Sequence, residues 1–86
     1  MKTKLQLVKR EIAGDVILVP VGEATTQIKG LLTLNATGSA IWDILPQADS
    51  EEDIVDSLFE EFDADRETLE RDVREFLDKL RDLNII

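Results

Sequence analysis

Paired carboxylates are the side chains in this sequence that could most readily do chemistry. Glu60 and Glu61 are adjacent, and Asp63 and Asp65 follow them closely. Such pairs can serve as general acid and base or bind a divalent cation. Proton transfer needs a carboxyl group whose pKa burial has shifted, whereas these acids lie in a polar helical pattern. The Asp63 segment also lacks the spaced oxygen ligands of an EF-hand loop. We therefore interpret these acids as surface residues.

Other groups for catalysis or cofactor binding are missing from the composition. The chain contains no His, Cys or Tyr, which removes the commonest general base, the usual zinc ligands and a thiolate nucleophile. The four glycines show neither a GxGxxG nor a Walker spacing, so a phosphate-binding loop has no support. We therefore predict a protein that is not an enzyme and that has no cofactor and no metal.

The charge is distributed unevenly along the chain. Net charge is −9, yet residues 1–34 carry five bases and three acids, and residues 49–63 carry eight acids and no base. Nucleic acids and anionic membranes attract clustered Lys and Arg, so neither is an expected partner. A solvated acidic face that keeps the domain soluble is the simplest interpretation of the acidic run.

The length and the N-terminal residues indicate one small domain in the cytoplasm. A chain of 86 residues with 43% hydrophobic residues can form a single core. After the charged start at Lys2 and Lys4, no apolar stretch is long enough for a secretory signal, and no segment reaches membrane-spanning length. The absence of cysteine fits a reducing compartment.

The first third of the sequence predicts three strands. Residues 4–12 and 15–21 have β-like patterns on either side of Ala13-Gly14, which favours a hairpin. The polar segment 22–27 is turn-prone, and a short third strand is expected from Gly30 to Leu34. Because this strand is short and irregular, we expect it at the edge of the sheet.

The remainder predicts three helices. Asn35 is a suitable N-cap for a helix that Pro46 ends, and Ser50 begins a capping box for a second. From Asp65 to Leu83, apolar residues recur every three or four positions along the longest helix. The predicted class is therefore α+β, a winged-helix-like arrangement of a three-stranded antiparallel sheet followed by three helices.

One flank of the third helix is both apolar and rich in arginine. On a helical wheel, Leu77 lies off the centre of the buried stripe, beside Arg74 and Arg81. This flank predicts either a binding surface or, equally, a core leucine beside arginines that pair with neighbouring acids. The opposite flank, which includes Asp72, Glu75 and Lys79, has the composition of a solvent-facing surface.

The order of these segments resembles the PqqD family and the related RiPP recognition elements. The similarity depends on Leu-Asn-x-Thr-Gly at 34–38, on Phe59-x-x-Phe62-Asp63, and on Phe76-Leu77-x-x-Leu80 before the C-terminal Ile85-Ile86. It implies a domain that binds the leader segment of a ribosomally made precursor peptide and presents it to a modifying enzyme, typically a radical SAM maturase. The leader is expected to add a strand beside the third strand and to contact the third helix. The residues to which we assign this role are Gly30, Leu31, Leu32, Thr33, Leu34, Val73, Arg74, Leu77 and Arg81.

Two other classes of function remain open at this point. A winged-helix DNA-binding or regulatory domain would share the architecture, but residues 65–83 are mixed in charge and not basic. An acidic dimerisation module could bury the same edge strand against a second copy. The sequence does not decide between a monomer and a homodimer, and it does not identify the precursor or the maturase.

Overall fold

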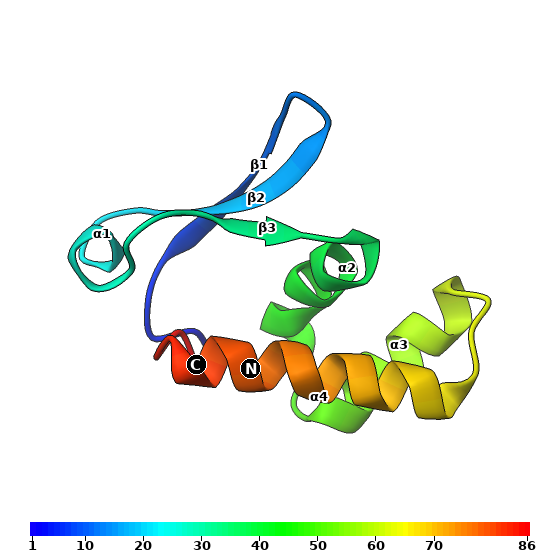
Figure 1. Ribbon diagram of the computed structural model, residues 1–86. Helices are drawn as coiled ribbons and strands as arrows, with labels where there is room; N and C mark the ends of the chain where they lie inside the picture. Colours follow the sequence, from blue (N-terminus) through cyan, green and yellow to red (C-terminus); the bar gives the residue numbers. More distant parts are fainter.

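The computed structural model describes residues 1–86 as a three-stranded sheet lying over a layer of helices (Figure 1). This arrangement confirms the predicted α+β class. Along the chain the elements are β1 (Leu7–Ile12), β2 (Asp15–Pro20), α1 (Ala24–Gln27), β3 (Leu32–Leu34), α2 (Ala36–Ile44), a 3₁₀ turn (Leu45–Gln47), α3 (Glu51–Glu61) and α4 (Arg66–Asp82).

The predicted hairpin is present, and its turn explains its register. β1 and β2 pair antiparallel from Leu7 opposite Pro20 to Ile12 opposite Asp15. The two turn residues, Ala13 and Gly14, have φ values of 53° and 86°. Positive φ at both positions is the type I′ geometry, whose twist matches that of the flanking strands. Both strands are slightly shorter than the sequence predicted.

β3 is an edge strand, as expected. The strand order is β1-β2-β3, so one side of β3 pairs with β2 and its other side is open. The strand begins at Leu32 and not at Gly30, because Gly30 has a φ of 95°, which no strand residue adopts.

A short helix that the sequence did not predict precedes β3. The polar segment expected to be only a turn forms the single helical turn α1, in which Ala24 is buried. The Thr25 and Thr26 hydroxyls donate to the carbonyls of Gly22 and Glu23. A four-residue helix is too short to show a 3.6-residue periodicity, which is why the pattern missed it.

The three predicted helices correspond to α2, α3 and α4. Asn35 and Ser50 are the N-caps of α2 and α3, and their side chains accept hydrogen bonds from the N–H groups of Gly38 (2.8 Å) and Asp53 (3.2 Å). Pro46 lies in the 3₁₀ turn that ends α2. These local signals position the helix ends, because each cap satisfies a backbone donor that the helix leaves free.

The core lies between the inner face of the sheet and the helices. It is one cluster of 17 buried hydrophobic residues, to which α4 contributes Leu69, Val73, Leu77 and Leu80. The C-terminal Ile85 is also fully buried, and its carbonyl accepts a hydrogen bond from the Lys4 N–H. The two ends of the chain are thus joined beside the end of α4 (Figure 1).

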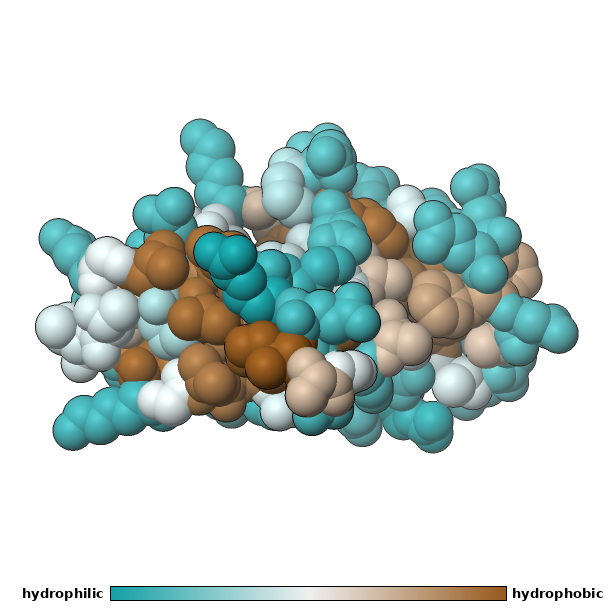
Figure 2. Space-filling model, turned by 90° about the horizontal axis from the view of Figure 1, so that it is seen from above, coloured by the Kyte–Doolittle hydropathy of each residue, from teal (hydrophilic) through white to brown (hydrophobic).

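The outer face of the sheet is also largely apolar. Ile17 is buried but lies outside the core cluster, on the face that points away from the helices. Seen from above, hydrophobic side chains gather over the strands (Figure 2). On the inner face, Lys9 crosses from β1 to α2 and donates to Ser39 (3.0 Å) and Asp43 (2.6 Å).

None of the helices combines the length and the hydrophobicity that a membrane span requires.

Candidate functional site: a cavity between β3, α2 and α4

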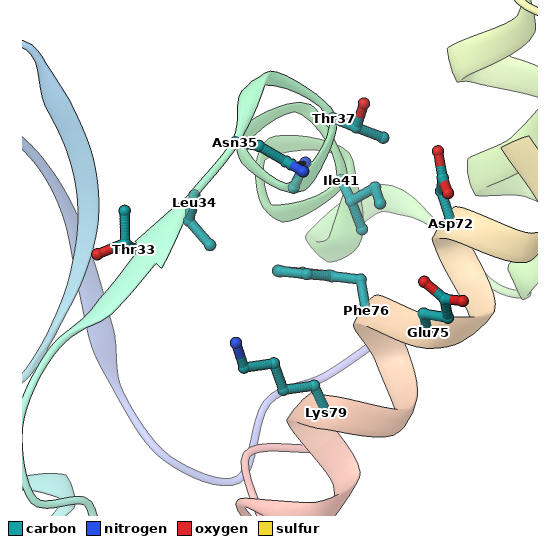
Figure 3. Close-up of a pocket in the computed structure, with 10 residues that line it drawn as sticks. Thr33, Leu34, Asn35, Thr37, Ile41, Asp72, Glu75, Phe76 and Lys79 are labelled. Carbon is teal, nitrogen blue, oxygen red and sulfur yellow. Dashed lines mark hydrogen bonds between the residues drawn. The ribbon is translucent and has the colours of Figure 1, made fainter.

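An open cavity of about 290 Å³ lies where the end of β3 and the start of α2 face α4 (Figure 3). Its walls come from three separate elements, and its mouth lies beside the free edge of the sheet. The lining residues are Thr33, Leu34, Asn35, Thr37, Gly38, Ile41, Asp72, Glu75, Phe76 and Lys79.

The floor of the cavity is apolar. Leu34 and Ile41 are buried, and Phe76 packs against the core with its side chain half-buried. In Figure 3 the Phe76 ring reaches from α4 toward β3, below Leu34. An aromatic ring in this position offers a large apolar contact to a side chain that enters from the mouth.

Gly38 determines how closely α2 approaches this ring. A Cβ atom at position 38 would lie 3.3 Å from Cε1 of Phe76 and 3.2 Å from Oδ1 of Asn35. Only glycine permits both the cap and the ring to occupy these positions without displacement. The Leu-Asn-x-Thr-Gly segment therefore has a physical role, because its Asn caps α2 and its Gly makes room for Phe76.

The rim of the cavity carries charges from α4 that have little compensation within the chain. Glu75 and Lys79 are exposed and form no ion pair. Asp72 has only a long contact of 4.0 Å with the neighbouring Arg71. Charges that are not paired within a domain are available to a charged ligand.

The backbone of β3 presents free hydrogen-bonding groups at the mouth of the cavity. The Val21 N–H donates to the Gln6 carbonyl across the β1–β2 ladder. Because backbone groups alternate in direction along a strand, those of Ile17 also point toward β1. Thr33 is the β3 partner of Ile17, so its N–H and C=O point away from β2 and toward the open edge. A guest strand can therefore bond to Thr33.

The predicted strand residues lie in this region, but only some of them line the cavity. Thr33 and Leu34 do so. Leu32 is half-buried on the inner face, whereas Leu31 is 57% exposed and precedes the strand together with Gly30. The sequence therefore located the edge of the sheet correctly. The contacts of residues 30–34 with a peptide remain a prediction.

The α4 residues predicted to face β3 are placed elsewhere. Val73 and Leu77 are 0% exposed in the core. Arg74 and Arg81 turn toward α3, where both approach Glu51, at 3.7 Å and 3.2 Å. The structure thus corrects the predicted orientation of α4 and matches the alternative in which Leu77 is core and the arginines pair with acids.

The contacts of Arg81 with acids also change its pKa. The pKa of its guanidinium is raised above the usual value, first because it donates a hydrogen bond to Glu51 and further because it donates to Asp78. This flank of α4 is therefore engaged with α3. The opposite flank, whose composition predicts a solvent-facing surface, instead faces the cavity with Asp72, Glu75 and Lys79.

Phe76 was the residue that could have revealed this orientation. It is the one aromatic residue of α4, and its spacing of seven from Leu69 and three from Val73 predicts that it belongs to the same buried stripe. Its half-buried position shows that it lies at the border of that stripe. No periodicity reveals which border meets the sheet, because that depends on how α4 packs against α3 and the strands.

The fold and the cavity together define a small domain whose open sheet edge lies beside a helix-walled apolar cavity. The sequence matches the model of the PqqD family, coenzyme PQQ synthesis protein D, over residues 15–86. The chain belongs to the PqqD family. No curated protein matches the sequence.

A solved structure extends the comparison to the whole chain. It is described as TbiB1 in complex with the TbiA(beta) leader peptide, and it is 33% identical in sequence with a TM-score of 0.72. The match covers 99% of this chain and 93% of the TbiB1 chain. The resemblance to leader-binding proteins that the sequence suggested is therefore confirmed at the level of family and fold.

Proposed function

We propose that this protein binds the leader segment of a ribosomally synthesised precursor peptide and presents the peptide to a modifying enzyme. The observation that carries the proposal is the similarity over nearly the full length to TbiB1, a protein solved with a leader peptide. The open edge of β3 and the adjoining cavity supply a place for such a peptide. The peptide adds a fourth strand beside β3.

The energetics assign most of the affinity to side chains. β3 has three residues, of which only Thr33 points its N–H and C=O to the open edge, so the guest strand gains two hydrogen bonds there, or up to four if it also bonds to Leu31 and Asn35. At roughly 1 kcal/mol net for each bond, this ladder contributes about 2 to 4 kcal/mol, whereas association costs about 4 to 15 kcal/mol. Apolar surface of the leader side chains, which includes the aliphatic stems of charged residues, therefore has to cover Leu34 and Phe76 in the cavity.

The residues assigned to the peptide site divide into three groups. Within the segment Gly30–Leu34, Thr33 supplies the backbone bonds, and Leu34 supplies apolar surface with Phe76 of α4. Val73 and Leu77 act indirectly, since they hold α4 in the core. Arg74 and Arg81 take no part in the contact, because they are engaged with Glu51.

The protein acts as an adaptor without a catalytic residue of its own, and its second partner is a maturase of the radical SAM type. The side chains that line the cavity include no pair poised for proton transfer or nucleophilic attack. No group of three or more acids could hold a metal ion. A role in DNA binding is less favoured, because the arginines of α4 are in contact with acids of this chain.

Isothermal titration calorimetry tests the proposal. The titrants are synthetic leader peptides of the short precursors encoded beside the gene, with a scrambled version of each as control. We expect saturable binding at one site for the cognate leader only. Equal heats for the cognate and scrambled peptides, or none for any leader, would overturn the proposal.

A further inference from the structure

Two charged side chains of α4 at the rim of the cavity, Glu75 and Lys79, form no ion pair within the chain. Each arginine of this helix, by contrast, lies within 4.0 Å of at least one acid of the same chain; these acids are Asp56, Glu70, Asp72, Glu51 and Asp78. Glu75 and Lys79 form no such contact, although they are four residues apart and have opposite charges. Both line the cavity.

Their separation along α4 matches the repeat of a β-strand. Four residues of helix rise about 6 Å, and alternate residues of a strand are about 6.6 Å apart. β3 and α4 run in nearly opposite directions across the cavity (Figure 1). A guest strand between them can therefore place two successive side chains of one face beside Glu75 and Lys79.

The register of the sheet determines which guest side chains these are. A guest residue opposite Thr33 has its side chain on the outer face, as Thr33 does (Figure 3). The guest residues opposite Leu32 and Leu34 point inward, toward α4. In Figure 3, Glu75 lies toward α2 and Lys79 reaches toward β3. The inward residue opposite Leu34 is thus nearer Glu75, and the one opposite Leu32 is nearer Lys79.

We propose that the cavity selects leaders with a basic residue followed two positions later by an acidic residue, bound antiparallel to β3 with these side chains beside Glu75 and Lys79. The antiparallel direction is favoured because its hydrogen bonds are better aligned. The charge order then fixes both the direction and the register of the leader. This inference rests on the proposed function, since it specifies the peptide that the same site takes.

A displayed library of random peptides tests the inference without knowledge of the natural leader. The library is selected against the wild-type protein and against the double variant Glu75→Lys/Lys79→Glu, which keeps the net charge. A matched control exchanges Glu61 and Lys29, which are exposed, unpaired and outside the cavity (Glu61→Lys/Lys29→Glu). Circular dichroism confirms that all variants are folded.

We expect wild type and control to enrich basic-x-acidic peptides and the double variant to enrich acidic-x-basic peptides. A peptide selected on the wild type should bind the double variant about tenfold more weakly, and reversing its two charges should restore affinity. Enrichment of the same peptides by all three proteins overturns the charge selection and leaves the peptide-binding function intact. Failure of the wild-type protein to enrich any peptide overturns both proposals.

Discussion

Gly38 of α2 and Phe76 of α4 face each other so closely that a Cβ atom on residue 38 would lie 3.3 Å from the aromatic ring. This contact joins the start of α2 to the wall of the cavity. It also links two parts of the sequence that no local pattern connects, the Leu-Asn-x-Thr-Gly segment and the border of the α4 stripe.

The first prediction concerns this contact. In Gly38→Ala, the added methyl group displaces the Phe76 ring or shifts α2, so we expect leader affinity to fall several-fold. Stability should change little, because the gain of about 1 kcal/mol in helix propensity offsets the new contact. Calorimetry and urea denaturation measure the two quantities. Ala36→Ser, in the exposed first turn, is the control, and equal affinities would contradict the role of Gly38.

Substitutions of the adjacent residues Phe76 and Leu77 of α4 should affect different properties, the first mainly peptide binding and the second mainly stability. Leu77 is fully buried, so Leu77→Ala should lower the free energy of unfolding by about 2 to 5 kcal/mol. Phe76→Ala should cost less stability, because the ring is half-buried, but it should abolish peptide binding. Urea denaturation and calorimetry distinguish them. Unchanged affinity in folded Phe76→Ala would show that the peptide does not use the cavity.

Proline substitutions should separate the two sides of β3. Thr33→Pro removes an N–H that points to the open edge, so the fold should persist while leader binding is lost. Leu32→Pro removes an N–H that pairs with β2, so it should destabilise the sheet itself. Thermal unfolding and calorimetry of both variants test this. Retained binding by Thr33→Pro would argue against strand addition.

The N-cap of α2 should contribute measurably to the free energy of unfolding. Asn35→Ala removes the side-chain oxygen that accepts from the Gly38 N–H, and we expect a loss of about 1 kcal/mol in the free energy of unfolding. Asn35→Asp keeps an acceptor there and should retain most of the stability. Urea denaturation provides the comparison. Equal losses in both variants would indicate that the hydrogen bond is not the cause.

Substitution of Arg81 should leave leader affinity unchanged and should lower the free energy of unfolding only slightly. Arg81→Ala breaks partly exposed contacts with Glu51 and Asp78, so the expected loss of stability is below about 1 kcal/mol. Leader affinity should stay at the wild-type value. Reduced affinity in calorimetry would support the original assignment of Arg81 to the peptide site and would contradict the orientation of α4 described above.

Local chemistry made the fold predictable, whereas the site depended on packing. Gly14 in the hairpin turn, the caps Asn35 and Ser50, and the stop at Pro46 each act within a few residues, so their effects could be inferred from sequence. The face of α4 is different. Both borders of its stripe carry charges, and which border meets the sheet is set by how the buried residues of α4 pack against α3 and the strands. Arg74 and Arg81 then lie beside Glu51 of α3.

The short length of β3 has a consequence for solubility. Gly30 with its positive φ precedes the strand and the cap of α2 follows it, so the unpaired stretch is three residues, about 10 Å, long. Amyloid-like stacking requires longer runs of exposed edge, typically six or seven residues. In the unbound protein, the edge of β3 can therefore stay exposed without copies of the chain stacking into fibrils at this edge.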